Sequence, residues 1–173
     1  MRCKNCKEKI EVVRFNQKFC LDNDECIKAF VEYTKAKEWL KRKKKMKAEL
    51  ETVQELLKKT QITFNTYIRL RDKSKGCISC NKPLTSKYDA GHFYSSGGHK
   101  SVTFNEDNCH GQCVECNRHK HGNLIPYQEN LIKRIGLCRY KELKRLSKLE
   151  IKYSRDELRQ IGKKYKEKCK EVK

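Results

Sequence analysis

The chain has 173 residues, enough for one medium domain or for two small domains and a linker. Lysine and arginine number 42 against 22 acidic residues, and the formal net charge of +20 favours a polyanionic partner, with nucleic acid ahead of a membrane surface. The sequence has no apolar run of 18 residues and no signal-peptide core at its start, which argues against a membrane span and against a secreted disulfide protein. We therefore expect a cytoplasmic protein without membrane attachment.

Residues 1–26 contain the first cysteine quartet. In a cytoplasmic chain such paired cysteines indicate metal binding rather than disulfides, and a segment this short needs an ion to become ordered. Val12, Val13 and Phe15 suggest a short hairpin between the pairs. We predict a small zinc ribbon or finger, against the alternative of free cysteines in a disordered leader; its ligands would be Cys3, Cys6, Cys20 and Cys26.

Residues 27–59 contain no proline or glycine and are predicted to form one long helix that needs a packing partner. Its centre is a basic run that would contact DNA phosphates, although a solvated helix face explains the same pattern. The run comprises Lys41, Arg42, Lys43, Lys44 and Lys45.

Residues 60–136 contain a second helix, over 62–72, and then a cysteine-framed segment that includes all five histidines. Four thiolates from this frame would complete a zinc shell, so this ion would be structural and would have no open position for water. The predicted ligands are Cys77, Cys80, Cys113 and Cys116. Between the pairs we expect a strand over 88–93, a glycine-rich loop, a returning segment and a short helix over 114–120.

Polar residues of this frame suit phosphodiester hydrolysis. A neutral imidazole such as His92 can act as a base near pH 7, and oxygen ligands such as Asp89 suit a divalent cation. In a regular strand Asp89 and Gly91 share one face and His92 lies on the other, so a bend would be needed for Asp89 and His92 to converge.

Pro126 is expected to open a helix that Gly136 closes. Residues 137–173 are predicted to form two further basic helices, of which the last begins with a capping box from Ser154 to Glu157. The expected fold class is α+β and mostly helical.

The order Cys-x2-Cys, His92, Asn108, Cys-x2-Cys, Asn117 resembles the HNH, or ββα-metal, nuclease motif in its His-Asn-Asn form, and is similar to phage endonuclease VII. Over residues 60–136 the chain more specifically resembles the lambdoid phage NinG (Rap) recombination family. The quoted segments are NTYIRLRD at 65–72, DAGHF at 89–93, QCVECN at 112–117 and GNLIPY at 122–127.

The resemblance implies a zinc-anchored ββα-metal core in a DNA endonuclease that uses Mg²⁺ or Mn²⁺. His92 would be the general base, Asn108 would hold the loop that orients it, and Asn117 would bind the catalytic cation. The position before His92, often a metal ligand in such enzymes, is Gly91 here, which leaves Asp89 as the candidate for the second ligand.

The other polar residues of the frame have less specific assignments. His110, His119 and His121 would contact phosphate or solvent together with Lys120, and His119 is an alternative cation ligand. Asn105 is the rival to Asn108, and Cys109 is expected to be a small buried residue.

The expected function is structure-selective cleavage of branched DNA, such as Holliday junctions and D-loops, by a homodimer in the bacterial host cytoplasm if the chain is phage-encoded. The alternatives are a non-catalytic, zinc-dependent nucleic-acid-binding protein and a sequence-recognising HNH nicking enzyme.

Overall fold

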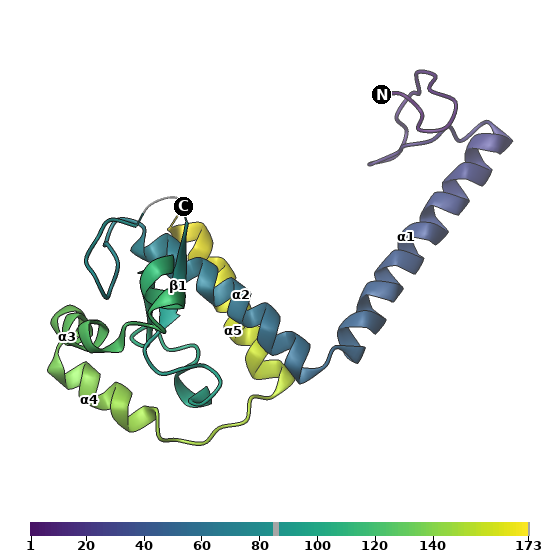
Figure 1. Ribbon diagram of the computed structural model, residues 1–173. Helices are drawn as coiled ribbons and strands as arrows, with labels where there is room; N and C mark the ends of the chain where they lie inside the picture. The colour runs from purple at the N-terminus through teal and green to yellow at the C-terminus, as the bar shows by residue number, and fades with distance from the viewer. Residues whose placement is uncertain (85–86, 173) are drawn as a thin grey trace. The chain divides into compact units, whose positions relative to one another are not determined.

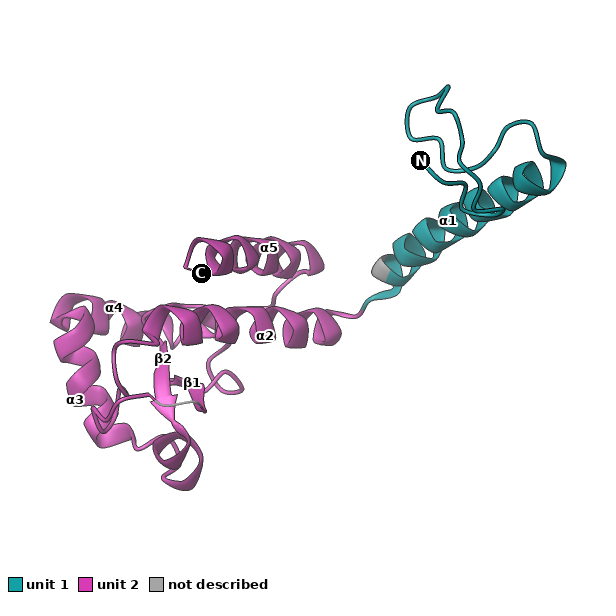
Figure 2. Cartoon of the chain, turned by 90° about the horizontal axis from the view of Figure 1, so that it is seen from above, with its two compact units in different colours: residues 1–51 teal, residues 52–173 magenta. Residues whose placement is uncertain are grey.

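The computed structural model describes residues 1–84 and 87–172, except for the side chain of Ala48. The chain divides into two compact units, Met1–Glu51 and Thr52–Lys173 (Figure 2). Each unit has its own small core, and each contains one cysteine quartet.

The first unit consists of an irregular cysteine-bearing segment followed by α1, Asp24–Leu50. Asn23 caps this helix, since its side chain accepts a hydrogen bond from the backbone N–H of Cys26, and acidic residues occupy the first turn. The predicted hairpin is wrong: strand-like pairing within residues 1–26 is limited to one bridge between Arg2 and Lys9, and Phe15 is 96% exposed.

The helix predicted over 27–59 is two helices. The first ends at Leu50 and the second, α2, runs from Val53 to Asp72, with Glu51 in an extended conformation between them. Thr52 caps α2 through a reciprocal capping box with Glu55, which satisfies the free backbone N–H groups that a new helix start creates.

The second unit is built around α2, which lies beside the C-terminal helix α5, Arg155–Glu171 (Figure 1). The predicted capping box of Ser154 and Glu157 at the start of α5 is confirmed. Aromatic side chains fill the interface between these helices; the ring of Phe64 is fully buried and packs edge-on against Tyr165.

A two-stranded antiparallel sheet packs against α2. Strand β1, Tyr88–His92, pairs with β2, Cys109–Cys113, so that His92 lies opposite Cys109 and Asp89 opposite Gln112. A short 3-10 helix, Lys100–Val102, interrupts the connection between the strands, and a single π-helical turn, η2, Glu115–His119, follows β2. The strand predicted over 88–93 and the short helix predicted over 114–120 lie where β1 and η2 are, and β2 begins directly after the segment predicted to return the chain.

Two further helices follow, α3, Leu124–Ile135, and α4, Leu137–Leu146, which meet at Gly136 and pack against each other, while α4 also contacts the 3-10 helix. Gly136 has φ +83°, a conformation that favours glycine and allows the sharp turn. Tyr127 and Leu131 are fully buried there, and the Tyr127 hydroxyl donates to the backbone oxygen of Gly91. The mostly helical α+β class is confirmed.

None of the helices in the described part of the chain is both long enough and apolar enough to cross a lipid bilayer.

Candidate active site and metal centres

The second unit brings Cys77, Cys80, Cys113 and Cys116 together, with all four sulfur atoms within 4.8 Å of one another. The sulfurs of Cys80 and Cys113 are 3.8 Å apart. Four thiolates bound tetrahedrally to zinc at about 2.3 Å would lie about 3.8 Å from one another. This quartet can therefore hold a zinc ion with little rearrangement.

The local backbone explains why these thiols converge. Cys77 and Cys80 lie in a tight turn closed by a hydrogen bond from Asn81 N–H to the Cys77 carbonyl, and the second pair joins the end of β2 to η2. Burial by itself opposes ionisation of Cys77, but backbone hydrogen bonds from Cys113 and Cys80 outweigh it and lower the pKa of its thiol to about 7. A thiolate is the form that binds zinc.

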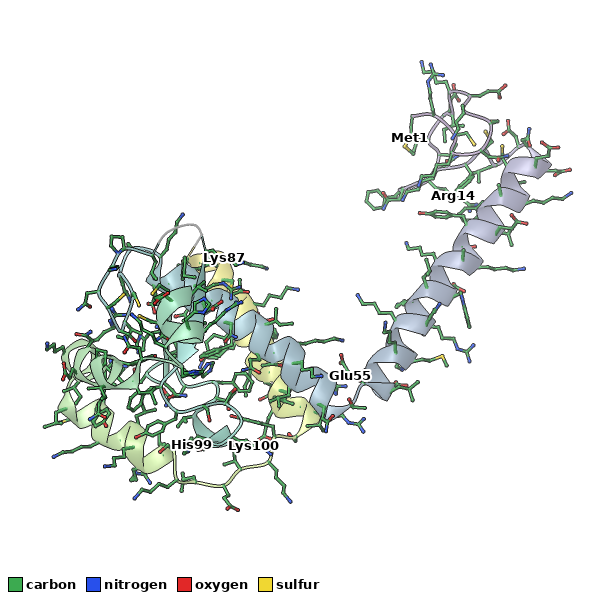
Figure 3. All side chains as sticks on the ribbon, viewed as in Figure 1. Met1, Arg14, Glu55, Lys87, His99 and Lys100 are labelled. Carbon is green, nitrogen blue, oxygen red and sulfur yellow. The ribbon has the colours of Figure 1, made fainter. Side chains whose placement is uncertain are left out.

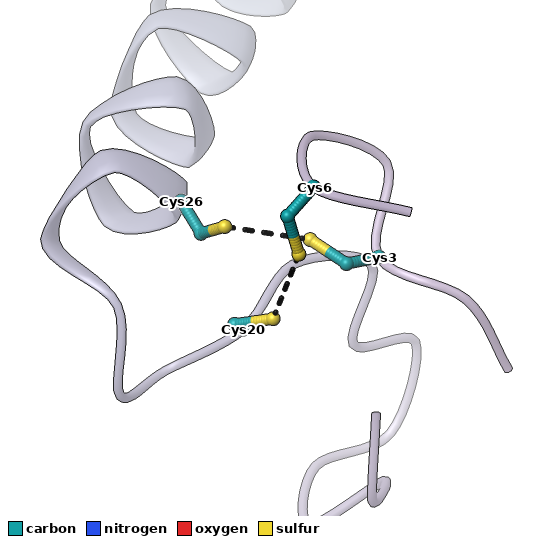
Figure 4. A group of neighbouring side chains, drawn as sticks. All are labelled: Cys3, Cys6, Cys20 and Cys26. Carbon is teal, nitrogen blue, oxygen red and sulfur yellow. Dashed lines mark hydrogen bonds between the residues drawn. The ribbon is translucent and has the colours of Figure 1, made fainter. Parts of the chain in front are cut away.

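The first unit contains an equivalent centre formed by Cys3, Cys6, Cys20 and Cys26 (Figure 4). The sulfur of Cys3 is 3.7 Å from that of Cys26, and the sulfurs of Cys6 and Cys20 are 3.5 Å apart. These separations also fit one tetrahedral zinc ion. The predicted pairing of both cysteine quartets into two metal-binding groups is therefore confirmed as geometry.

His92 ends β1 with its ring between the sheet and α2, near Phe64. Its Nε2 is 3.1 Å from the backbone oxygen of Thr103. Because a carbonyl oxygen only accepts, Nε2 bears the proton in the neutral ring and Nδ1 has the lone pair. Burial lowers the pKa of His92, and this effect outweighs the opposing hydrogen bond to Thr103. The ring is thus neutral near pH 7.

The Nδ1 atom of His92 lies 3.6 Å from the sulfur of Cys109. Cys109 is fully buried, as predicted, and does not belong to either metal-binding quartet. A thiol is a weak hydrogen-bond donor, so it competes only weakly for the Nδ1 lone pair.

Asn108 is fully buried in the loop between the strands. Its side-chain nitrogen donates to the backbone oxygens of Tyr94 and Val102, and its side-chain oxygen accepts from the Tyr94 N–H. These three hydrogen bonds hold Asn108, at the end of the loop that follows His92, to Tyr94 and Val102 within it. Its rival Asn105 makes only a local bond to the N–H of Asp107. Asn108 therefore makes backbone bonds that hold this loop, and its role in orienting His92 stays a prediction.

Asp89 and Asn117 meet on the face of β1 opposite to that of His92. The Asn117 side-chain nitrogen donates to Oδ2 of Asp89 at 3.0 Å. Arg118 binds the same carboxylate with two hydrogen bonds, at 2.8 and 2.9 Å. These hydrogen bonds, that of Arg118 foremost, lower the pKa of Asp89. The Arg118–Asp89 ion pair was not predicted, because nothing in the spacing marks it.

Gly91 has no room for a side chain. A Cβ atom there would lie 2.1 Å from Oε1 of Gln112, whose amide nitrogen is held by Ser79 and the backbone of Gly122. A metal ligand at position 91 would therefore require Gln112 to move. Asp89, two residues earlier, presents its carboxylate on the same face of the strand.

The remaining histidines separate into buried and exposed ones. His119 and His121 are exposed next to Lys120, as predicted. The expectation that His110 contacts phosphate or solvent is wrong: it is 3% exposed, and its Nδ1 lies 3.1 Å from the guanidinium of Arg71. Asp72, fully buried, binds Arg71 and the backbone N–H of Gly111, so this cluster fixes the end of α2 to β2.

The basic run of α1 is solvent-exposed throughout, from Lys41 to Lys45. Side chains project from α1 along its whole length (Figure 3). Lys45 lies 4.0 Å from Glu49, and such an exposed pair contributes little to stability. The exposed side chains from Lys41 to Lys45 are therefore accessible to an external polyanion.

The family model described as "Bacteriophage Lambda NinG protein" matches residues 1–173. The NinG protein of Salmonella phage P22 is 37% identical over 116 residues, which are 67% of this chain and 57% of that protein. The NinG protein of Escherichia phage lambda is 46% identical over 80 residues, which are 46% of this chain and 39% of that protein. The NinG protein of Escherichia phage 933W is 38% identical over 116 residues, which are 67% of this chain and 57% of that protein.

The chain spans a little over half the length of the P22 and 933W relatives. No solved structure matches it significantly. The match to the family model over residues 1–173, together with these identities, means that the chain belongs to the NinG family of bacteriophage proteins.

Proposed function

We propose that this protein is a metal-dependent, structure-selective DNA endonuclease that cleaves branched recombination intermediates, with His92 as the general base. The observation that carries the proposal is the hairpin and short helix joined by the second cysteine quartet, which bring Asp89 to Asn117 on one face and hold a neutral His92 at the strand end. The order of the cysteine pairs, His92, Asn108 and Asn117 in the sequence, which resembles the HNH, or ββα-metal, motif in its His-Asn-Asn form, supports the same proposal.

In this mechanism His92 Nδ1 accepts a proton from the attacking water. The bond from Nε2–H to the Thr103 carbonyl orients the ring and stabilises the imidazolium that forms. Asn108 holds the loop on which this geometry depends, through its bonds to Tyr94 and Val102. Asn108 is therefore a positioning residue rather than one that touches the reacting atoms.

The pair of Asp89 and Asn117 fits a hard divalent cation, because it offers a carboxylate and a carboxamide from residues already in contact. This pair lies on the face of β1 opposite His92, so the proposal requires the scissile phosphate to lie at the edge of β1 that does not pair with β2, where groups from both faces can reach it. Asp89 and Asn117 would hold Mg²⁺ or Mn²⁺, which would supply Lewis-acid stabilisation of charge on the phosphate. Arg118, whose side chain is 57% exposed, can leave Asp89 and turn to a phosphate oxygen.

Branched DNA suits the charge of the chain. The net charge of +20 and the exposed run at Lys41–Lys45 favour backbone contacts, which read shape rather than base sequence. Exposed His119, Lys120 and His121 would add phosphate contacts next to Asn117. Symmetrical cleavage of a four-way junction requires two active sites, so we propose that the protein acts as a homodimer.

A second candidate function is a non-catalytic, zinc-dependent nucleic-acid-binding protein. One observation favours it: Arg118 neutralises Asp89 through two hydrogen bonds, as a permanent ion pair in a purely structural fold would do. A sequence-recognising HNH nicking enzyme would share the site and differ only in its dependence on DNA sequence.

The test is to incubate the purified protein with labelled four-way junction, D-loop and linear duplex, with and without Mg²⁺ or Mn²⁺. The proposal requires cation-dependent cleavage of branched DNA, loss of that cleavage in His92→Ala, and retained binding. Cleavage of linear duplex at an equal rate would remove structure selectivity. Binding without cleavage under all conditions would favour the non-catalytic alternative.

A further inference from the structure

An apolar groove lies beside the residues that directly follow His92. Its volume is about 390 Å³, and it is lined by Phe93, Tyr94, Ser95, His99, Leu124, Ile125 and Gln128. None of these lining residues is acidic. Apolar walls with a few polar groups are typical of a site for a flat ligand that makes a small number of directed hydrogen bonds.

Two of the lining residues are aliphatic side chains that are exposed to solvent. Leu124 is 48% exposed and Ile125 79% exposed, at the start of α3. The turn before them is tightly specified, since Gly122 and Asn123 both have positive φ, and Tyr127 anchors the helix in the core. Adjacent exposed apolar residues on so ordered a turn indicate an interaction surface.

The aromatic residues that line the groove are fixed to the candidate active site. The rings of Phe93 and Tyr94 lie 4.8 Å apart, and those of Tyr94 and His99 lie 5.1 Å apart. Both the backbone N–H and the backbone C=O of Tyr94 are bonded to the buried side chain of Asn108. The side-chain amide of Asn108 therefore holds the loop after His92 and also fixes the position of Tyr94 in the groove.

The polar groups of the groove can form hydrogen bonds with the edge of a heterocycle. His99 Nδ1 lies 2.9 Å from the backbone oxygen of Ser147, so in the neutral ring Nδ1–H donates there and Nε2 remains an acceptor. Gln128 is exposed and offers both a donor and an acceptor. The turn that leads to Leu124 bears exposed Lys120 and His121, which suit the phosphates of the same nucleotide strand.

From this combination we propose that the groove binds an unpaired nucleobase of branched DNA, stacked against the aromatic and aliphatic residues that line it. The inference rests on the proposed function and adds to it the feature that distinguishes a branch point from linear duplex: a base free to leave its stack. Stacking of a base on an aromatic side chain changes affinity by roughly 5- to 150-fold.

The test measures binding rather than cleavage, using full-length protein that carries His92→Ala so that the DNA stays intact. Fluorescence anisotropy compares a forked DNA with unpaired thymines at the branch and a fully paired duplex of equal length. Ile125→Ser and Gln128→Ala alter the groove. Ile62→Ser is the matched control, because Ile62 lies on α2, is 66% exposed and does not line the groove.

We expect Ile125→Ser to weaken binding of the fork by roughly 10-fold, because the exposed aliphatic side chain would no longer be buried against the base, and Gln128→Ala by a smaller factor, with less than 2-fold effects on duplex. Ile62→Ser should leave both affinities unchanged. In addition, 5-iodouracil at the unpaired position should photo-crosslink to the peptide that contains Phe93 and Tyr94.

Crosslinks that map elsewhere would overturn the inference, and so would equal losses of fork affinity in Ile125→Ser and Ile62→Ser. It would also be overturned if an apolar peptide bound the groove and the unpaired thymines of the fork did not raise affinity over duplex. These outcomes are separate from a failure of the proposed function, which would appear as absence of cleavage by the wild-type protein. Zinc content and circular dichroism of each variant establish that the fold is retained.

Discussion

Asn117 and Asp89, 28 residues apart in sequence, are joined by a 3.0 Å hydrogen bond between η2 and β1. The short helix that bears Asn117 has little stability of its own, and Cys116 within it ties it to the cysteine quartet. The proposed cation site would therefore depend on a zinc ion held by that quartet.

Removal of one thiolate should release one of the two zinc ions. We expect Cys116→Ser to contain about one zinc per chain rather than two, and to lose ordered structure in the second unit, since zinc supplies part of its folding free energy. Elemental analysis and circular dichroism measure both effects. Cys138→Ser, at an exposed cysteine outside both quartets, is the control. Unchanged zinc content in Cys116→Ser would contradict the assignment.

Asn108→Ala should destabilise the second unit by at least about 2 kcal/mol, because backbone groups of Tyr94 and Val102 lose their hydrogen-bond partner inside the protein. Urea denaturation measures the change. Asn105→Ala removes only a local turn contact and should cost less than about 1 kcal/mol. Equal stability of the two variants would show that Asn108 does not hold the loop.

The cleavage rate should decline on acidification only below about pH 6.5, the ordinary pKa of histidine. Burial disfavours the charged ring and lowers the pKa of His92, so the base form persists to lower pH than in a free imidazole. A pH–rate profile under single-turnover conditions locates this limb. A limb centred above pH 7 would exclude His92, with its lowered pKa, as the group that titrates.

Arg118→Ala should lower the Mn²⁺ concentration needed for half-maximal cleavage, because Arg118 competes with the cation for the Asp89 carboxylate. A Mn²⁺ titration of the initial rate measures this. Lys120→Ala removes a neighbouring cation that forms an ion pair with Glu115 rather than with Asp89, and is the matched control. A Mn²⁺ requirement that stays the same in Arg118→Ala would argue against Asp89 as a ligand.

Replacement of Lys41, Lys43 and Lys44 by Gln should weaken DNA binding and reduce the slope of log K against log salt by up to about 3, since each phosphate contact contributes about 0.9. The same number of charges removed from α1 at Lys28, Lys35 and Lys37 provides the comparison. Equal changes in slope would mean that the run at 41–45 acts only through net charge.

Features set by short-range chemistry could be predicted from the sequence. The cysteine spacings predicted both quartets, and the pattern from Ser154 to Glu157 predicted the start of α5. The pattern from Thr52 to Glu55 is of the same kind, yet the helix was expected to continue through it. That signal was present and would have placed the boundary between the two units correctly.

Features set by contacts between distant segments could not be predicted. His110 is buried because Arg71 and Asp72, 39 and 38 residues earlier, meet it across the interface of α2 and β2. Likewise, the pairing of Arg118 with Asp89 depends on how the quartet orients η2. Neither contact has a local sequence pattern.

The central claim is that His92 acts as a base on DNA, and single-turnover cleavage of a labelled four-way junction in Mg²⁺ tests it most directly. The account predicts cleavage by the wild-type protein, a rate roughly 10²- to 10⁴-fold lower in His92→Ala, and junction affinity changed by less than about 2-fold. A wild-type protein that binds the junction without cutting it, or a His92→Ala variant that cuts it at the wild-type rate, would contradict the account.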